Sequence, residues 1–252
     1  MIKKLTTLSA LALAFAATPA LAQTGHVGVA YSSNDDIDSS VWAVEGATTF
    51  AFSENIGAQL DGNIGSYDDG ADAELGWRIN GHLFYNAGNF RVGGVFGNST
   101  VDLGGIEPRT THWGVEGQYN FGQIVLGGSA IWGDAEGVIS PDLDYENVLL
   151  NGDFYVTDNF VIGAAYGFGT IDNGVSEADT TNYSVNAEYQ FGSAPFSIVA
   201  GWQHWELNDI PVESEGFTIG GRWNWGGTIR ERDAAGFRNT PSSILEQFFG
   251  LQ

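Results

Sequence analysis

Apolar and polar residues alternate in long runs along most of this chain. The clearest run is WGVEGQYNFGQIVLGGSAIWG at residues 113–133, where every second residue from Trp113 is apolar, aromatic or glycine. The alternation breaks at Gly122 and Gln123 and resumes from Ile124. A period of two is typical of a β-strand whose two faces meet different surroundings. The run therefore predicts two strands joined by a tight turn.

Four other segments share this layout of strand, short break and second strand. The first strands of the five hairpins end at Phe52, Tyr85, Phe121, Val156 and Phe191, which gives spacings of 33, 36, 35 and 35 residues. A near-constant period indicates one supersecondary unit, here a hairpin, repeated along the chain. Twelve strands are predicted in total. They cover residues 25–32, 40–52, 56–67, 73–85, 90–98, 110–121, 124–133, 146–156, 160–170, 181–191, 196–206 and 216–227.

The predicted connections alternate in length. Short breaks such as GQ and TDN follow every second strand, whereas longer acidic segments such as GDAEGVISPDLDY follow the others. Short turns at one end and long loops at the other describe an up-and-down antiparallel meander. The even strand number places both ends of the meander on the short-turn side.

The apolar row of many strands has aromatic residues at both ends and Val, Ile, Leu, Ala or Gly between them. Rows of this kind form two aromatic girdles at the interfaces of a membrane, and strands of about 9–13 residues suit a tilted crossing of the bilayer. The opposite faces are polar into mid-strand, which inverts a soluble barrel. We therefore predict an all-β, up-and-down antiparallel transmembrane β-barrel of about twelve strands over residues 23–227; a secreted sandwich or lectin-like jelly roll is the alternative. The predicted girdle residues are Trp42, Trp77, Tyr85, Trp113, Tyr119, Phe121, Trp132, Tyr189, Phe191, Trp223 and Trp225.

The first 22 residues have the three regions of a secretory signal peptide. Lys3 and Lys4 precede an apolar stretch, and Ala20-Leu21-Ala22 forms an A-x-A cleavage site. The stretch is too short for a membrane span, so we predict cleavage after Ala22 and export of the protein.

The composition lacks cysteine and is strongly acidic. The chain has no cysteine, which excludes disulfides and thiolate metal sites. The net charge is −22, and removal of Lys3 and Lys4 leaves seven arginines against 31 acids, or 7 − 31 = −24. A field of this sign repels nucleic acid and attracts cations, so no nucleic-acid partner is expected.

The hairpin repeat, the signal peptide and strand ends such as YNFG at 119–122 and YQFG at 189–192 are similar to those of porin-like outer-membrane β-barrel proteins of Gram-negative bacteria, in particular the small porin family. The resemblance covers the signal peptide and nearly all of residues 25–227. It implies residence in the bacterial outer membrane, with membrane lipid and lipopolysaccharide as partners. It also implies passive diffusion of small hydrophilic solutes, and the acid excess predicts a preference for cations. One alternative is a non-conducting barrel that acts structurally or through its acidic loops; no oligomeric state is predicted.

Strand parity points a set of charged side chains into the barrel. They form either a constriction that favours cations or ion pairs that fill a plugged interior; paired buried charges stabilise little unless every group is satisfied. The predicted pore-lining residues are Glu45, Asp61, Glu74, Arg78, Arg91, Glu116, Asp153, Glu188 and Arg222.

No enzymatic activity, cofactor or metal site is predicted. The four histidines, His26, His82, His112 and His204, lack an HExxH or paired spacing, and no serine with a distinctive neighbourhood accompanies the inward His82. Acids in the long loops form a solvated rim or, alternatively, capture cations at the outer mouth.

The tail after the last strand differs from the resembled barrels, which usually end on an aromatic that serves as an assembly signal. Here the last predicted strand ends near Trp225, so the signal is either internal or read from Phe248 and Phe249. Residues 228–252 are predicted to be a periplasmic tail, in which Ser242 or Ser243 caps a short helix. The tail packs under the barrel mouth, binds a periplasmic partner or remains a loose terminus.

Overall fold

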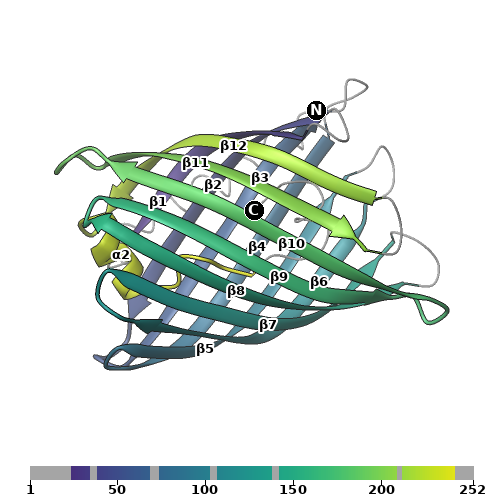
Figure 1. The fold of residues 1–252 in the computed structure, drawn as a ribbon, viewed down its shortest axis with the longest axis horizontal. Helices are drawn as coiled ribbons and strands as arrows, with labels where there is room; N and C mark the ends of the chain where they lie inside the picture. The colour runs from purple at the N-terminus through teal and green to yellow at the C-terminus, as the bar shows by residue number, and fades with distance from the viewer. Residues whose placement is uncertain are drawn as a thin grey trace.

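Twelve antiparallel strands form a closed barrel in the computed structural model, which describes residues 24–34, 39–68, 74–102, 107–137, 142–208 and 212–241. Each strand pairs with its neighbours in sequence, and β1 closes the barrel by pairing with β12 (Figure 1). The predicted up-and-down β-barrel is confirmed. The strands are β1 (Thr24–Asn34), β2 (Ser39–Ala51), β3 (Ile56–Asp68), β4 (Glu74–Ala87), β5 (Phe90–Val101), β6 (Arg109–Asn120), β7 (Ile124–Glu136), β8 (Leu143–Thr157), β9 (Phe160–Asp172), β10 (Glu177–Gln190), β11 (Phe196–Leu207) and β12 (Val212–Trp225).

The turn between β6 and β7 explains why the alternation in residues 113–133 breaks at Gly122 and Gln123. Gly122 has a φ of 90°, a conformation that glycine adopts more easily than any residue with a Cβ. Its N–H donates to the Oδ1 of Asn120 at 2.8 Å, and the N–H of Phe121 donates to the carbonyl of Ile124, also at 2.8 Å. These bonds fix the register, which places Trp113 opposite Trp132 at the far end of the hairpin.

Several strands begin earlier at the long-loop end than the alternation predicts. β8 begins at Leu143 rather than at residue 146, β10 at Glu177 rather than at residue 181, and β12 at Val212 rather than at residue 216. The added residues alternate acids with other types, so their outward positions are polar and carry no apolar signal. Backbone pairing continues there because it does not depend on an apolar face.

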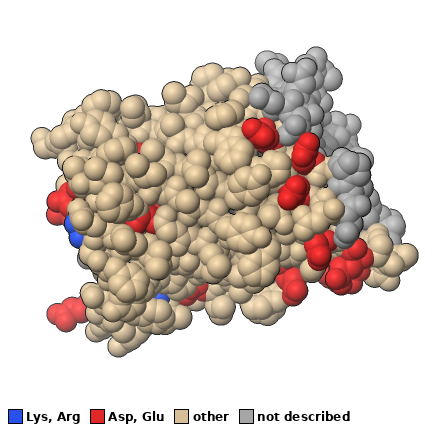
Figure 2. Space-filling view, in the orientation of Figure 1, with Lys and Arg blue, Asp and Glu red and all other residues tan. Residues whose placement is uncertain are grey.

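The outer wall of the barrel is apolar. On the face in Figure 2, a broad band across the middle of the wall is largely free of charged residues, and acidic residues gather at the end where the long loops lie. Of the predicted girdle residues, Trp77 and Trp225 are half-buried, and the others are exposed on the outside of the barrel. Some pack in cross-strand pairs, with ring centroids 5.2 Å apart for Trp113 and Trp132. An exposed apolar band of this width suits lipid rather than water.

After β12 the chain turns back into the barrel. Residues 226–241, here called the plug, include the helix α2 (Ile229–Ala235) at the short-turn end (Figure 1). The helix begins with a capping box, in which the side chains of Thr228 and Glu231 each accept a backbone N–H of the other residue. Ile229 is fully buried against the inward side chains of β7, β8 and β9. No helix in the described ranges is long and apolar enough to cross a membrane.

The described part of the predicted tail lies inside the barrel. The inward faces of β3, β4 and β8 offer polar partners to its backbone and side chains there. The predicted signal peptide, the predicted helix from Ser242 and the two terminal phenylalanines fall outside the described residues.

Candidate functional site in the barrel lumen

The charged residues expected to face inward lie in the lumen. Glu74 is on β4, but its side chain is outside the described part of the chain. Glu45 and Arg222 are half-buried in the lumen, and the other six are buried: Asp61, Arg78, Arg91, Glu116, Asp153 and Glu188.

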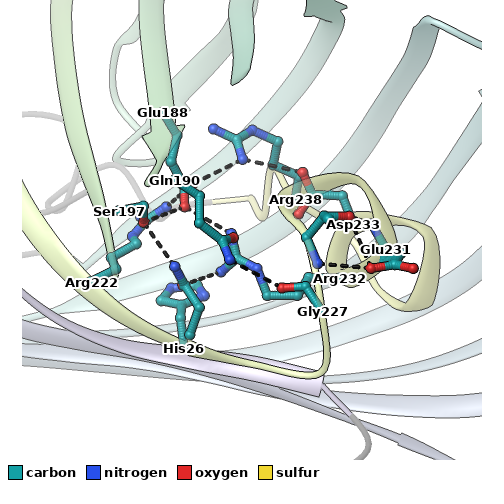
Figure 3. Close-up of polar contacts among 12 residues, drawn as sticks. His26, Glu188, Gln190, Ser197, Arg222, Gly227, Glu231, Arg232, Asp233 and Arg238 are labelled. Carbon is teal, nitrogen blue, oxygen red and sulfur yellow. Dashed lines mark hydrogen bonds and ion pairs between the residues drawn. The ribbon is translucent and has the colours of Figure 1, made fainter. Parts of the chain in front are cut away.

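Glu188 on β10 is the centre of one charged cluster (Figure 3). Its carboxylate accepts from Arg222 at 2.8 Å, from Arg232 at 2.7 Å and from Arg238 at 3.1 Å. The hydroxyl of Ser197 donates to it at 2.7 Å. Because the Glu188 side chain is fully buried, these donors replace the water that a carboxylate would otherwise bind.

Arg222 links Glu188 to the acid on β2. Its Nε and Nη2 donate to the two carboxylate oxygens of Glu45 at 2.6 and 2.9 Å, which is a bidentate pair. The cluster therefore joins β2, β10 and β12 with two arginines of the plug.

His82 on β4 is held between two acids in a second cluster. Its Nε2 lies 2.6 Å from Asp61, and its Nδ1 lies 2.7 Å from Glu116. An imidazolium donates from both nitrogens, so this protonation state satisfies both carboxylates at once. Arg78 lies 3.9 Å from Asp61 and adds positive charge to the same wall.

Arg91 on β5 holds the end of the plug helix. It donates to the carbonyls of Asp233 at 3.5 Å, of Ala234 at 2.6 Å and of Gly236. Its guanidinium also lies over the ring of Phe237 at 5.3 Å. A cation at this position satisfies carbonyls that an α-helix leaves without partners at its C-terminus.

Further hydrogen bonds join the plug to the lumen wall. Gln59 makes a reciprocal pair with the backbone of Phe237, accepting from its N–H at 2.8 Å and donating to its carbonyl at 3.0 Å. Asn239 donates to Asp153 at 2.8 Å. Further contacts join Thr240 to Asp61, Asn80 to the carbonyl of Pro241, and Tyr155 to Asp233.

Arg238 is the most enclosed cation of the plug. Burial lowers its pKa, but the carboxylates of Asp233, Glu188 and Asp153 outweigh burial and raise the pKa above the ordinary value for arginine. The guanidinium therefore stays charged and keeps the plug attached to β8 and β10.

A cavity of about 250 Å³ lies in the lumen, on the long-loop side of the plug. Its wall carries side chains from both charged clusters and amide and hydroxyl groups from β8, β10, β11 and β12, and plug residues line it as well. Nearer the long-loop end, six inward side chains are buried in an apolar cluster: Val41, Val95, Val101, Ile131, Tyr145 and Trp205. The described lumen is thus a polar chamber with the plug on its short-turn side.

The arrangement of charge agrees with ion pairs that fill a plugged interior, and not with a constriction that favours cations. Acids and arginines are paired with one another instead of lining opposite walls. Sequence reasoning missed that the plug supplies Arg232, Arg238 and Asp233 to these pairs. The available signal was that three of the seven arginines after the signal peptide lie in the tail.

The sequence profile of the Gram-negative porin family matches residues 46–195. No curated protein sequence matches the chain. Among solved structures, the KdgM porin is 8% identical, with a TM-score of 0.54 over 79% of this chain and 99% of its own. The same porin in complex with disordered oligogalacturonate is 11% identical, with a TM-score of 0.55 over 79% and 99% of the two chains. The translocator domain of the autotransporter NalP from Neisseria meningitidis is 10% identical, with a TM-score of 0.50 over 89% and 98%. At these identities the likeness shows the fold alone.

Proposed function

This chain belongs to the Gram-negative porin family, and we propose that it is an outer-membrane channel through which small hydrophilic solutes diffuse, with a preference for cations and with the plug controlling its opening. The observation that carries the proposal is the polar chamber of the lumen, which is lined on one side by the barrel wall and on the other by the plug. A purely structural barrel has no need of such a chamber.

The charge of the lumen supports the preference for cations. Of the inward charged side chains that the structure describes, five are acids and three are arginines; with the imidazolium of His82 as a fourth cation, the balance is 4 − 5 = −1. The plug adds Arg232, Arg238 and Asp233, a balance of 2 − 1 = +1, which leaves the closed lumen neutral. Movement of the plug out of the lumen therefore exposes a more negative wall, which attracts cations.

The way in which the plug is held supports its role as a gate. Its described contacts with the barrel run through side chains, apart from one backbone bond at 3.1 Å from the N–H of Arg230 to the carbonyl of Asp158 in the turn between β8 and β9. The plug forms no β-ladder, so the loss of these contacts leaves the hydrogen bonds between the strands intact. Segments held in this way open at lower free energy than strands within a sheet.

One structural neighbour has been solved in complex with a sugar acid. The KdgM porin has been seen with oligogalacturonate, which is a polyanion. The net negative charge of the lumen wall, which is exposed when the plug moves out, disfavours a polyanion, so small neutral or cationic solutes are the proposed substrates.

A non-conducting barrel is the second candidate function. The paired charges around Glu188 and the apolar cluster near the long-loop end favour it, because both fill the interior. In that case the acidic rim of the long loops is the functional surface.

Recording of single channels in planar bilayers under a salt gradient separates the two functions. We expect the full-length protein to show infrequent openings and a reversal potential of the sign for cation selectivity. A reversal potential of the opposite sign overturns the charge argument. Absence of openings, both in the full-length protein and in a variant whose plug is loosened, overturns the channel.

A further inference from the structure

A histidine and three glutamates meet on the outward face of β11 and β12, at the long-loop end. The register places His204 opposite Glu215 and Glu206 opposite Glu213. All four side chains point away from the lumen, just beyond the aromatic residues Trp202 and Phe217 of the same two strands. The cluster is thus separate from the lumen chamber and from the plug.

Potential ligand atoms of His204, Glu206 and Glu213 all lie within 4.8 Å of one another. The Nε2 of His204 is 3.6 Å from a carboxylate oxygen of Glu206. This distance is too long for a hydrogen bond. It matches two ligands on one ion, because metal–ligand distances of about 2.0–2.2 Å in a tetrahedral site place ligand atoms roughly 3.3–3.6 Å apart.

The imidazole of His204 is buried, and one of its two nitrogens has no hydrogen-bond partner. Its side chain is 10% exposed, and its Nδ1 makes no hydrogen bond within the described part of the chain. Stacking on the ring of Tyr183, at 4.8 Å between centroids, and contact with Trp202 hold the imidazole in place. A buried nitrogen without a partner needs an explanation. An ion on Nε2 gives one, because it leaves the proton on Nδ1, which faces Glu215.

The fourth carboxylate completes the surroundings of the histidine. Glu215 accepts from the indole N–H of Trp202 at 2.9 Å, and its other oxygen lies 3.9 Å from the Nδ1 of His204. A histidine that binds a metal through one nitrogen commonly donates through the other to a carboxylate. Glu215 is placed for that second role.

We propose that His204, Glu206 and Glu213 form a binding site for a divalent transition-metal ion such as Zn²⁺. One imidazole with two carboxylates suits zinc and its neighbours, whereas Ca²⁺ and Mg²⁺ select sites made of oxygen alone. The ion offsets the repulsion between acids on adjacent strands and joins the ends of β11 and β12. The glutamates are partly exposed, so they have room to close on the ion.

The test is titration of metal-free full-length protein with Zn²⁺ by calorimetry, in detergent without lipopolysaccharide and without a histidine tag. We expect one Zn²⁺ per chain, and a loss of affinity of at least tenfold in the variant His204→Gln. The double variant Glu206→Gln/Glu213→Gln leaves the stacked rings in place and is expected to lose the site as well.

The matched control is Asp179→Asn, an exposed outward acid at the same end of β10. It is expected to bind Zn²⁺ like the unaltered protein, while heat-modifiable migration on a gel shows which variants keep the barrel. The proposal is overturned if the unaltered protein binds no stoichiometric Zn²⁺. It is also overturned if the folded double variant binds as tightly as the unaltered protein, or if Asp179→Asn weakens binding as much as the ligand variants do.

Discussion

Replacement of Arg91 by methionine is expected to open the barrel without unfolding it. Arg91 is buried, and three of its contacts are hydrogen bonds to carbonyls at the end of the plug helix. Methionine keeps much of the apolar stem and removes every donor. The strands keep their ladder, so most of the loss falls on the plug. Within the barrel wall, Arg91 also loses the bond from its Nε to the Oδ1 of Asn86 at 2.7 Å and its contact with the ring of Phe84.

The magnitude follows from the contacts that disappear. A hydrogen bond to a charged group contributes about 1.5–3 kcal/mol, and a cation over a ring contributes about 0.5–1 kcal/mol or more. The bond to Asp233 is long at 3.5 Å and counts little. The two shorter bonds and the ring contact together shift the equilibrium between the closed and open positions of the plug by about 3.5–7 kcal/mol, or a factor of roughly 300 to 10⁵ at 1.4 kcal/mol per tenfold change.

Single-channel recording in planar bilayers measures this shift as open probability. We expect Arg91→Met to spend far more time open than the unaltered protein, with a similar conductance per opening. Arg109→Met is the matched control, because Arg109 is exposed on the outward face of β6. If Arg91→Met is folded, by heat-modifiable migration, and remains as silent as the unaltered protein, the plug is not the gate.

Three further substitutions test the ion path, the packing between strands and the aromatic girdle. Glu116→Gln removes an inward acid and is expected to move the reversal potential toward that of an unselective channel; an unchanged potential places Glu116 away from the ion path. Gly97→Val is expected to destabilise the barrel by about 1–3 kcal/mol in denaturant titrations, because its Cβ meets the side chains of Asn80 and His112. Gly94→Val on the same strand is the control and is expected to have little effect, because its Cβ makes only an ordinary contact, 3.6 Å from the carbonyl oxygen of Gly114. Trp113→Ala removes a ring pair and is expected to lower the free energy of unfolding in lipid vesicles by about 1 kcal/mol or more; equal stability removes the girdle argument for this pair.

The fold was largely predictable because each strand alternates between two different solvents. Period-two alternation placed all twelve strands, and parity placed side chains such as Glu188 and Arg222 inside the barrel. Strand ends were predicted less well. Beyond the apolar band, outward residues such as Glu213 and Glu215 are polar, so the alternation disappears although pairing continues to Val212.

The clusters in the lumen required the register, which no local pattern encodes. His82 meets Asp61 and Glu116 across three strands, at separations of 21 and 34 residues. The plug is harder still, because its contacts depend on single polar groups such as Gln59, 178 residues away from Phe237 in the chain. The cluster around His204 escaped sequence reasoning because the predicted β12 began only after Glu213 and Glu215.

We propose that the plug, and not the barrel wall, closes the passage. A disulfide between Thr49→Cys and Gly236→Cys tests it directly, because the hydroxyl oxygen of Thr49 lies 2.6 Å from the position of a Cβ on Gly236 and the chain has no cysteine of its own. Introduced into Arg91→Met, this pair is expected to silence the channel when oxidised and to restore its openings when reduced. Equal conductance in the oxidised and reduced states would show that the plug does not close the passage.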